Sequence, residues 1–256
     1  MATMKNAQFE GKSVVITGSG RGIARQVAID FAADGARVAV VDLVPDRAQA
    51  VVKEILAVGG AAIPVVCDVR DEASVRAMVR EVMGAHKRID VLVNAAGGYT
   101  LGRKTHEMTE DDWDMVVDSN LKGTFLCCKH VLPPMMAAGG GRIVNFSSNA
   151  GRTSSPALGC HYTAAKAGVL GLTRHLAKEY ASHKILVNTV APGPARVERN
   201  FEILSEEARA RLLADIPLGR FAEPSDLSAV VRFLASDGGQ FITGATIDVN
   251  GGYVMV

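Results

Sequence analysis

The sequence is poor in cysteine: its 256 residues include only four, at Cys67, Cys127, Cys128 and Cys160. None forms a C-x-x-C pair, which argues against a zinc site or redox dithiol and favours free thiols in a reducing cytoplasm. The formal net charge is only +1, so the sequence does not suggest a nucleic-acid or anionic-membrane partner. No stretch reaches the roughly 18 uncharged apolar residues of a membrane span, and residues 1–13 lack the apolar core of a signal peptide. We expect a cytoplasmic protein that binds neither nucleic acid nor membrane.

Short β-branched runs alternate with longer helical patterns along the chain. We expect strands at 12–17, 36–42, 61–68, 89–97, 141–148, 184–193 and 245–252. Helical spacing of apolar residues predicts helices at 22–35, 47–60, 71–86, 109–136, 161–181 and 223–236. Thr109 with Asp112 is typical of a capping box, and Pro224 suits a first helical position. Strands that are apolar on both faces and alternate with helices indicate an α/β fold, a doubly wound parallel sheet of about seven strands.

No linker, repeat or low-complexity tract divides the chain, so we expect residues 1–256 to form a single domain. The segment 194–223, rich in Arg and Glu, is the one long connection. We expect it to be a mobile flap over a site, and we call it the flap below. In doubly wound sheets, ligands bind beyond the carboxyl ends of the strands. The polar and Gly-rich strand exits are therefore the first candidates for a site.

The first strand exit, TGSGRGIA, carries glycines at positions 18, 20 and 22. Glycine permits a tight turn and lets backbone N–H groups approach a pyrophosphate at a helix N-terminus. Ile23 stands where the common dinucleotide fingerprint has its third glycine, so the pattern is T-G-x-x-x-G-x-G, with Ala24 in place of the last glycine. Alone, this turn fits a plain βα loop as well as a phosphate cradle.

Asp42 ends the second expected strand, about twenty residues past the glycines, where an acid bonds the ribose 2′-OH of an adenine dinucleotide. Its structural alternative is a turn acid before the next helix. With the glycine turn upstream we favour the binding role. A carboxylate there repels a 2′-phosphate, which favours NAD over NADP. Arg21 within the turn argues the other way, because a basic residue can meet that phosphate.

Further short motifs follow in a fixed order: CDV (67–69), NAAG (94–97), SN (119–120), SS (147–148), YTAAK (162–166) and NTVAPG (188–193). The ordered set resembles the short-chain dehydrogenase/reductase family over essentially the full chain. The resemblance implies a Rossmann-type fold, a nicotinamide cofactor and a homotetramer. It also implies hydride transfer between NAD(H) and a small-molecule secondary alcohol or ketone.

The resemblance implies a cofactor-binding set at the strand exits: Gly18, Arg21, Gly22, Ile23, Asp42, Asp68, Val69, Asn94, Tyr162, Lys166 and Val190. In that set Asp68 and Val69 flank the adenine, Asn94 supports the central strand, and the backbone near Val190 meets the nicotinamide carboxamide. One departure concerns the flap. Val197 stands where the family often has a threonine that bonds cofactor oxygen atoms.

The resemblance also implies four catalytic residues. Ser148 holds the substrate oxygen and Tyr162 is the acid/base. Lys166 bonds the nicotinamide ribose and tunes Tyr162, while Asn120 places a water that carries the proton onward. The interval between serine and tyrosine is one residue longer than is usual in the family. Either the loop 149–161 carries an extra residue or Asn149 shifts the register, and we choose Ser148 over Ser147.

The Tyr162–Lys166 spacing allows this chemistry only under a condition. Bringing a phenol from a pKa of about 10 to about 7 takes roughly 4 kcal/mol. A positive charge at 4 Å supplies about 1 kcal/mol in bulk water and about 4 kcal/mol at an effective dielectric constant of 20. The pair is therefore catalytic in a partly dehydrated site, with help from the positive charge of the oxidised nicotinamide, and has no such role if water covers it.

Two alternatives remain open from the residues. An NADPH-dependent reductase of 3-oxoacyl thioesters is supported by Arg21 and opposed by Asp42. A nucleotide-binding sensor or scaffold without turnover has no need of the phenol and serine. The substrate pocket is expected to be formed by Tyr99, Leu101, Cys160, His161 and residues 194–215. We expect no metal, since His86, His106, His130, His175 and His183 show no ligand spacing.

Overall fold

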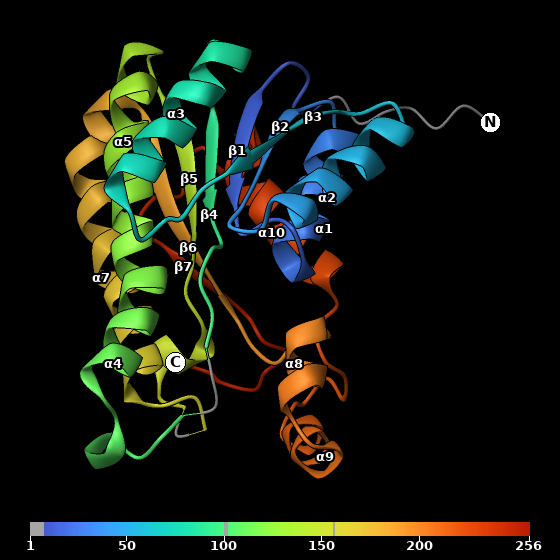
Figure 1. Cartoon of the computed structure of the whole chain (residues 1–256), viewed down its shortest axis with the longest axis vertical. Coiled ribbons are helices and arrows are strands. Elements are labelled where there is room, and N and C mark those ends of the chain that lie inside the picture. Colours follow the sequence, from blue (N-terminus) through green and yellow to red (C-terminus); the bar gives the residue numbers. More distant parts are fainter. Residues whose placement is uncertain (1–7, 100–101, 156) are drawn as a thin grey trace.

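The computed structural model describes residues 8–99, 102–155 and 157–256, which contain one seven-stranded sheet in the order β3-β2-β1-β4-β5-β6-β7 (Figure 1). The strands are β1 (Ser13–Thr17), β2 (Arg37–Asp42), β3 (Ala61–Val66), β4 (Val91–Asn94), β5 (Gly141–Phe146), β6 (Ile185–Pro192) and β7 (Thr246–Val249). Every strand pair is parallel. The predicted doubly wound parallel sheet is confirmed. Its order reverses between β1 and β4, which is where such sheets bind ligands.

Helices cover both faces of the sheet (Figure 1). One layer comprises α1 (Gly22–Ala33), α2 (Pro45–Ala57) and α10 (Pro224–Ala235), and the other comprises α3 (Glu72–His86), α5 (Gly123–Ala137) and α7 (Cys160–Tyr180). Successive residues of β1 point to opposite layers. Val14 and Ile16 pack in the core with α1 and α10, whereas Val15 packs in the core with α3 and α5. Burial on both sides explains why the strands read as continuous apolar runs.

The single helix expected at 109–136 is interrupted. A capping box of Thr109 and Asp112 begins α4 (Glu110–Val117), as predicted. A π-helical turn at Asp118–Lys122 then separates α4 from α5. Such turns insert one extra residue per hydrogen-bonded loop and often occur at functional sites. This one directs Asn120 inward, where its side chain is buried.

Three short helices lie in segments for which the sequence predicted none. Ser148 accepts a hydrogen bond from Ala150 N–H and begins α6 (Asn149–Arg152). The flap contains α8 (Glu198–Ile203) and α9 (Glu206–Ala214), which lie below the sheet in Figure 1. The remaining helical turns are η1 (Thr105–Glu107), η3 (Ala181–His183) and η4 (Asp237–Gly239). Across the described residues, every helix is too short or too polar to cross a membrane.

Candidate active site

A cavity of about 620 Å³ opens at the carboxyl ends of the central strands. Its lining comes from the exits of β1, β2, β3, β4, β5 and β6, from the start of α7 and from the flap. These segments are far apart in the sequence, and the parallel sheet brings their ends together. The cavity therefore stands where the fold predicts a ligand.

The glycine turn forms the floor of the cavity at β1. Gly18 has φ +68°, and a Cβ placed there would lie 2.8 Å from Ala96 Cα. Gly22 also has positive φ, and a Cβ there would approach only Val197 and Glu198 of the flap, at 3.7 Å or more. Thr17 Oγ1 accepts hydrogen bonds from Ala95 and Ala96 N–H, which tie the turn to the β4 exit. The result is an open, backbone-lined cradle suited to a phosphate group.

Asp42 is held beside this turn. Its Oδ2 accepts the Gly20 N–H at 2.9 Å and its Oδ1 accepts the Val44 N–H at 3.0 Å. The carboxylate thus performs the structural role of a turn acid and also lines the cavity. Each carboxylate oxygen has a second lone pair, so these bonds leave acceptor capacity for a ligand hydroxyl. The two roles weighed from the sequence are compatible in one residue.

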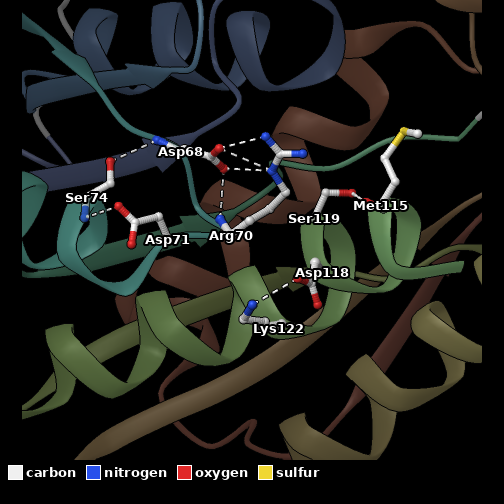
Figure 2. A network of polar contacts seen from close by, with 8 residues as sticks. All are labelled: Asp68, Arg70, Asp71, Ser74, Met115, Asp118, Ser119 and Lys122. Carbon is white, nitrogen blue, oxygen red and sulfur yellow. Dashed lines mark hydrogen bonds and ion pairs between the residues drawn. The ribbon is translucent and has the colours of Figure 1, made fainter. Parts of the chain in front are cut away.

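Asp68 and Val69 line the next part of the cavity, after β3. Figure 2 shows Asp68 in a forked contact with Arg70, whose Nη2 lies 2.7 Å from Asp68 Oδ2. The hydrogen bond from Arg70 lowers the pKa of the Asp68 carboxyl. Ser74 Oγ accepts the Asp68 N–H and fixes the turn into α3 (Figure 2). Asp68 is therefore ionised and oriented before any ligand arrives.

The two serines that end β5 have different surroundings. Ser147 is buried, and its Oγ donates to the Lys166 carbonyl at 2.7 Å. Ser148 donates to Asn149 Oδ1 at 3.0 Å and hydrogen bonds the Tyr162 phenol. Both serines line the cavity. Both hydroxyl protons are therefore donated within the fold, that of Ser147 to a backbone carbonyl and that of Ser148 to a neighbouring side chain.

Tyr162 and Lys166 lie together at the start of α7, and both are buried. Lys166 Nζ lies 5.7 Å from the centroid of the Tyr162 ring and donates to the Phe146 carbonyl at 2.9 Å. Burial lowers the pKa of the Lys166 ammonium to about 8. Burial also raises the pKa of the Tyr162 phenol, against the lowering effects of the Ser148 hydrogen bond and the Arg199 charge. Burial therefore favours the uncharged form of both groups.

Asn120 lies on the far side of the cavity, in the π-helical turn. Its Nδ2 donates to the Gly98 carbonyl at 2.8 Å and to the Val116 carbonyl at 2.9 Å. Its Oδ1 is buried without a hydrogen-bond partner among the described residues. Gly97 has φ +131°, and a Cβ there would lie 2.5 Å from that oxygen. Burying a hydrogen-bond acceptor without a partner costs free energy, so this oxygen is suited to accept a hydrogen bond from a bound water or a ligand hydroxyl.

Known proteins match this chain over nearly its whole length. A family model described as "Enoyl-(Acyl carrier protein) reductase" matches residues 18–254. The 3-oxoacyl-[acyl-carrier-protein] reductase FabG of Staphylococcus aureus is 43% identical over 95% of this chain and 98% of its own length. The chain belongs to the short-chain dehydrogenase/reductase family. It is therefore an oxidoreductase, which removes the interpretation as a sensor or scaffold without turnover.

Solved structures of this dehydrogenase/reductase family superpose closely on the chain. A 3-oxoacyl-[acyl-carrier protein] reductase with bound NAD from Brucella melitensis has a TM-score of 0.91 at 35% identity, covering 98% of this chain and 94% of its own. A 7α-hydroxysteroid dehydrogenase, complexed with NADH and 7-oxo glycochenodeoxycholic acid, has a TM-score of 0.92 at 31% identity, covering 98% of both chains. The family binds a nicotinamide cofactor.

Several residues predicted from the sequence lie away from the cavity of this dehydrogenase/reductase. Asn94 donates to Asn145 Oδ1 at 2.8 Å and joins β4 to β5. Val190 is fully buried in β6, and its carbonyl accepts the Ser147 N–H, so Pro192, Gly193 and Pro194 line the cavity in its stead. Cys160 and His161 were expected in the pocket, but within the described part of the chain neither lines it. His161 turns inward, where its Nδ1 accepts the Tyr162 N–H. Leu101 lies outside the described residues.

The flap contributes residues that sequence reasoning missed. Arg199 lies 5.3 Å from the centroid of the Tyr99 ring, and Asn200 Oδ1 accepts a hydrogen bond from the Tyr99 hydroxyl. Tyr99 in turn packs edge-on against Tyr162, with ring centroids 5.3 Å apart. Arg21 pairs with Glu202 of the flap at 3.7 Å. A flap rich in Arg and Glu signals ion pairs, but no periodicity indicates which of them point inward.

Proposed function

We propose that this enzyme interconverts the 3-oxo and 3-hydroxy forms of an acyl thioester with NAD(H). The observation that carries the proposal is the buried group of Tyr162, Ser148, Lys166 and Asn120 around one cavity. The substrate class is supported by the relatives, since the Staphylococcus aureus protein and the Brucella melitensis structure are both 3-oxoacyl-[acyl-carrier-protein] reductases by name. Asp42 supports NAD(H), because its carboxylate repels a 2′-phosphate.

The residues present fit such a cofactor. Gly18 and Gly22 with Ile23 offer a backbone cradle for the diphosphate, and Asp42 offers acceptors for the ribose. Asp68 and Val69 lie where the adenine is expected. Lys166 and Tyr162 line the same cavity, where the nicotinamide is expected. The bound nicotinamide supplies a hydride to the substrate carbonyl carbon or accepts one from the alcohol.

The chain's own residues hold and protonate the substrate oxygen. The Ser148 hydroxyl donates a hydrogen bond to it, which favours charge developing on that oxygen. The Tyr162 phenol gives its proton in reduction and takes it back in oxidation. The Lys166 ammonium stabilises the phenolate, and the unpartnered Asn120 Oδ1 holds a water that passes protons onward.

The names of the relatives favour the thioester over the generic small alcohol or ketone that the sequence favoured. The second candidate remains an NAD-dependent dehydrogenase of another secondary alcohol. It is supported by the structural similarity to a hydroxysteroid dehydrogenase. Binding of NADPH, the cofactor of the thioester alternative, is disfavoured by the Asp42 carboxylate beside Gly20. Arg21, which could meet the 2′-phosphate of NADPH, pairs with Glu202.

Three further properties belong to this proposal. The flap moves to admit the cofactor and substrate, since it covers the cavity from β6 to α10. The enzyme assembles as a homotetramer, as the family resemblance implies. It works in the cytoplasm, where the free thiols of Cys67, Cys127 and Cys128 stay reduced.

The test is absorbance in the reduced-nicotinamide band with 3-oxobutyryl and 3-hydroxybutyryl thioesters, each with the NAD and NADP couples. We expect turnover with NAD(H) that Tyr162→Phe lowers at least about a thousandfold, because the proton donor is lost. We expect Asp42→Ala to weaken NAD binding and to relax the discrimination against NADP. Turnover of hydroxysteroids or simple alcohols without thioester turnover would select the second candidate.

A further inference from the structure

The flap places a guanidinium in the cavity wall next to Tyr99, and this guanidinium has no carboxylate partner within the described part of the chain. Arg199 is half-buried, lines the cavity and lies 5.3 Å from the centroid of the Tyr99 ring. Its Nη1 rests against the backbone of Gly98, the residue whose carbonyl accepts the Asn120 N–H. The cation is therefore fixed by an aromatic face and a backbone surface and keeps N–H donors for a ligand.

The acidic residues nearest in sequence do not neutralise Arg199. Glu202 lies 3.7 Å from the Arg21 guanidinium, and the Glu198 carboxylate lies against Gly22. Among the described residues, no Asp or Glu oxygen lies within 4.0 Å of an Arg199 nitrogen, whereas the flap residues Arg196 and Arg220 pair with Glu223 and Asp226. Partial burial of an unpaired charge is unfavourable, so the site is completed by an anion from outside the chain.

The position of Arg199 relative to the phenol indicates which anion. The guanidinium contacts Tyr99, and Tyr99 packs on Tyr162, so Arg199 lies at the part of the cavity that holds the phenol. Burial raises the pKa of the Tyr162 phenol and the Arg199 charge opposes that rise, which is a second sign of proximity. The planar guanidinium matches a carboxylate through two parallel hydrogen bonds.

We propose that Arg199 binds a carboxylate on the substrate, so that the enzyme also oxidises short free hydroxy acids, a class distinct from neutral thioesters and simple alcohols. This inference rests on the hydride transfer of the proposed function. In this reaction the hydroxyl carbon gives a hydride to NAD⁺ and the hydroxyl proton goes to the Tyr162 phenolate. The products are an oxo acid and NADH. Arg199 holds the carboxylate and takes no part in the transfer.

The experiment compares 3-hydroxybutyrate with its methyl ester, which has the same reacting carbon and no charge, in wild type, Arg199→Met and Arg199→Lys. We expect wild type to show a kcat/KM about 10- to 100-fold higher for the acid, the range of a charge-assisted hydrogen bond. Arg199→Met should erase this difference through KM, while Arg199→Lys should keep part of it. Arg196→Met is the matched control, because Arg196 is an exposed flap arginine paired with Glu223.

Other results overturn the inference. Equal use of acid and ester by wild type, or failure to oxidise the acid while the 3-hydroxybutyryl thioester is oxidised, rejects it and leaves the proposed function standing. Oxidation of the acid without oxidation of the thioester rejects the proposed function alone. If Arg199→Met weakens NADH binding as much as it lowers kcat/KM for the acid, Arg199 serves the cofactor.

Discussion

The side chain of Lys166 carries a buried ammonium group, and burial lowers the pKa of this group from its usual 10.5 to about 8. At pH 7 the group is charged in the folded and unfolded states, so folding bears the desolvation cost, about 3 kcal/mol for a shift of this size. Between pH 8 and 10.5 the unfolded chain keeps a proton that the folded protein releases. The free energy of unfolding therefore rises with pH across that window.

Replacing the ammonium tests this cost directly. We expect Lys166→Met to be inactive in hydride transfer, yet more stable than wild type at pH 7, by up to about 3 kcal/mol. Urea unfolding from pH 7 to pH 10 should show the advantage shrinking as wild type sheds its proton. Lys178→Met, on the exposed face of the same helix, should show no such trend. If the gain in the free energy of unfolding of Lys166→Met is constant with pH, desolvation of the Lys166 ammonium is not its cause.

Individual residues also show where prediction from sequence ends. Gly18 and Asp42 could be predicted because backbone conformation and charge at a strand exit depend on local sequence. The different surroundings of Ser147 and Ser148 could not be predicted from spacing, since they depend on which hydroxyl donates to the Lys166 carbonyl. Arg199 was missed for the same reason, because only the folded flap decides which arginine faces Tyr99.

Among the elements, the flap most directly affects cofactor binding. Glu198 Oε2 would lie 3.8 Å from a Cβ at Gly22, so a carboxylate faces the place expected for the diphosphate. We expect Glu198→Gln to tighten NADH binding about threefold at low salt, because a like charge at this range is worth under about 1 kcal/mol in a water-like medium. The gain should fade as salt screens the repulsion.

Equilibrium titration of NADH fluorescence at two ionic strengths measures this effect. Glu206→Gln, an exposed acid on α9, provides the matched control and should leave the affinity unchanged. If Glu198→Gln weakens NADH binding, the carboxylate holds the flap in place and its repulsion is not the dominant effect.

Helices with a clear apolar period were predicted, and those without one were not. Residues 109–136 carry an unbroken helical pattern, so nothing in it indicates the π-helical turn at Asp118–Lys122. In that turn the Asn120 side chain donates to the Gly98 and Val116 carbonyls, contacts that the sequence pattern does not show. The short helices α6, α8 and α9 are too short to show a period, and capping by Ser148 and Ser205 marks two of their starts.

For the whole molecule, the doubly wound parallel sheet could be predicted from the sequence because burial on both faces and right-handed crossovers leave few alternatives. The assembly of chains does not follow from these rules, since it depends on contacts between their outer surfaces. The outward side of α7 carries small residues. Ala164 and Ala167 are exposed there, and a Cβ added to Gly171 would have no atom within 4 Å. Small side chains let helix backbones approach closely, as the tetramer proposal requires.

A charged, bulky residue on this face tests the assembly. We expect wild type to sediment at about four times the 27.0 kDa chain mass and Ala167→Arg to sediment as a smaller species, because the guanidinium blocks close helix contact. Ala50→Arg places the same change on an exposed alanine of α2, in the opposite layer, and should keep the wild-type mass. Circular dichroism checks that both variants fold. A wild type that sediments as a single chain would exclude the tetramer, while an Ala167→Arg variant of full mass would place its interfaces on another face.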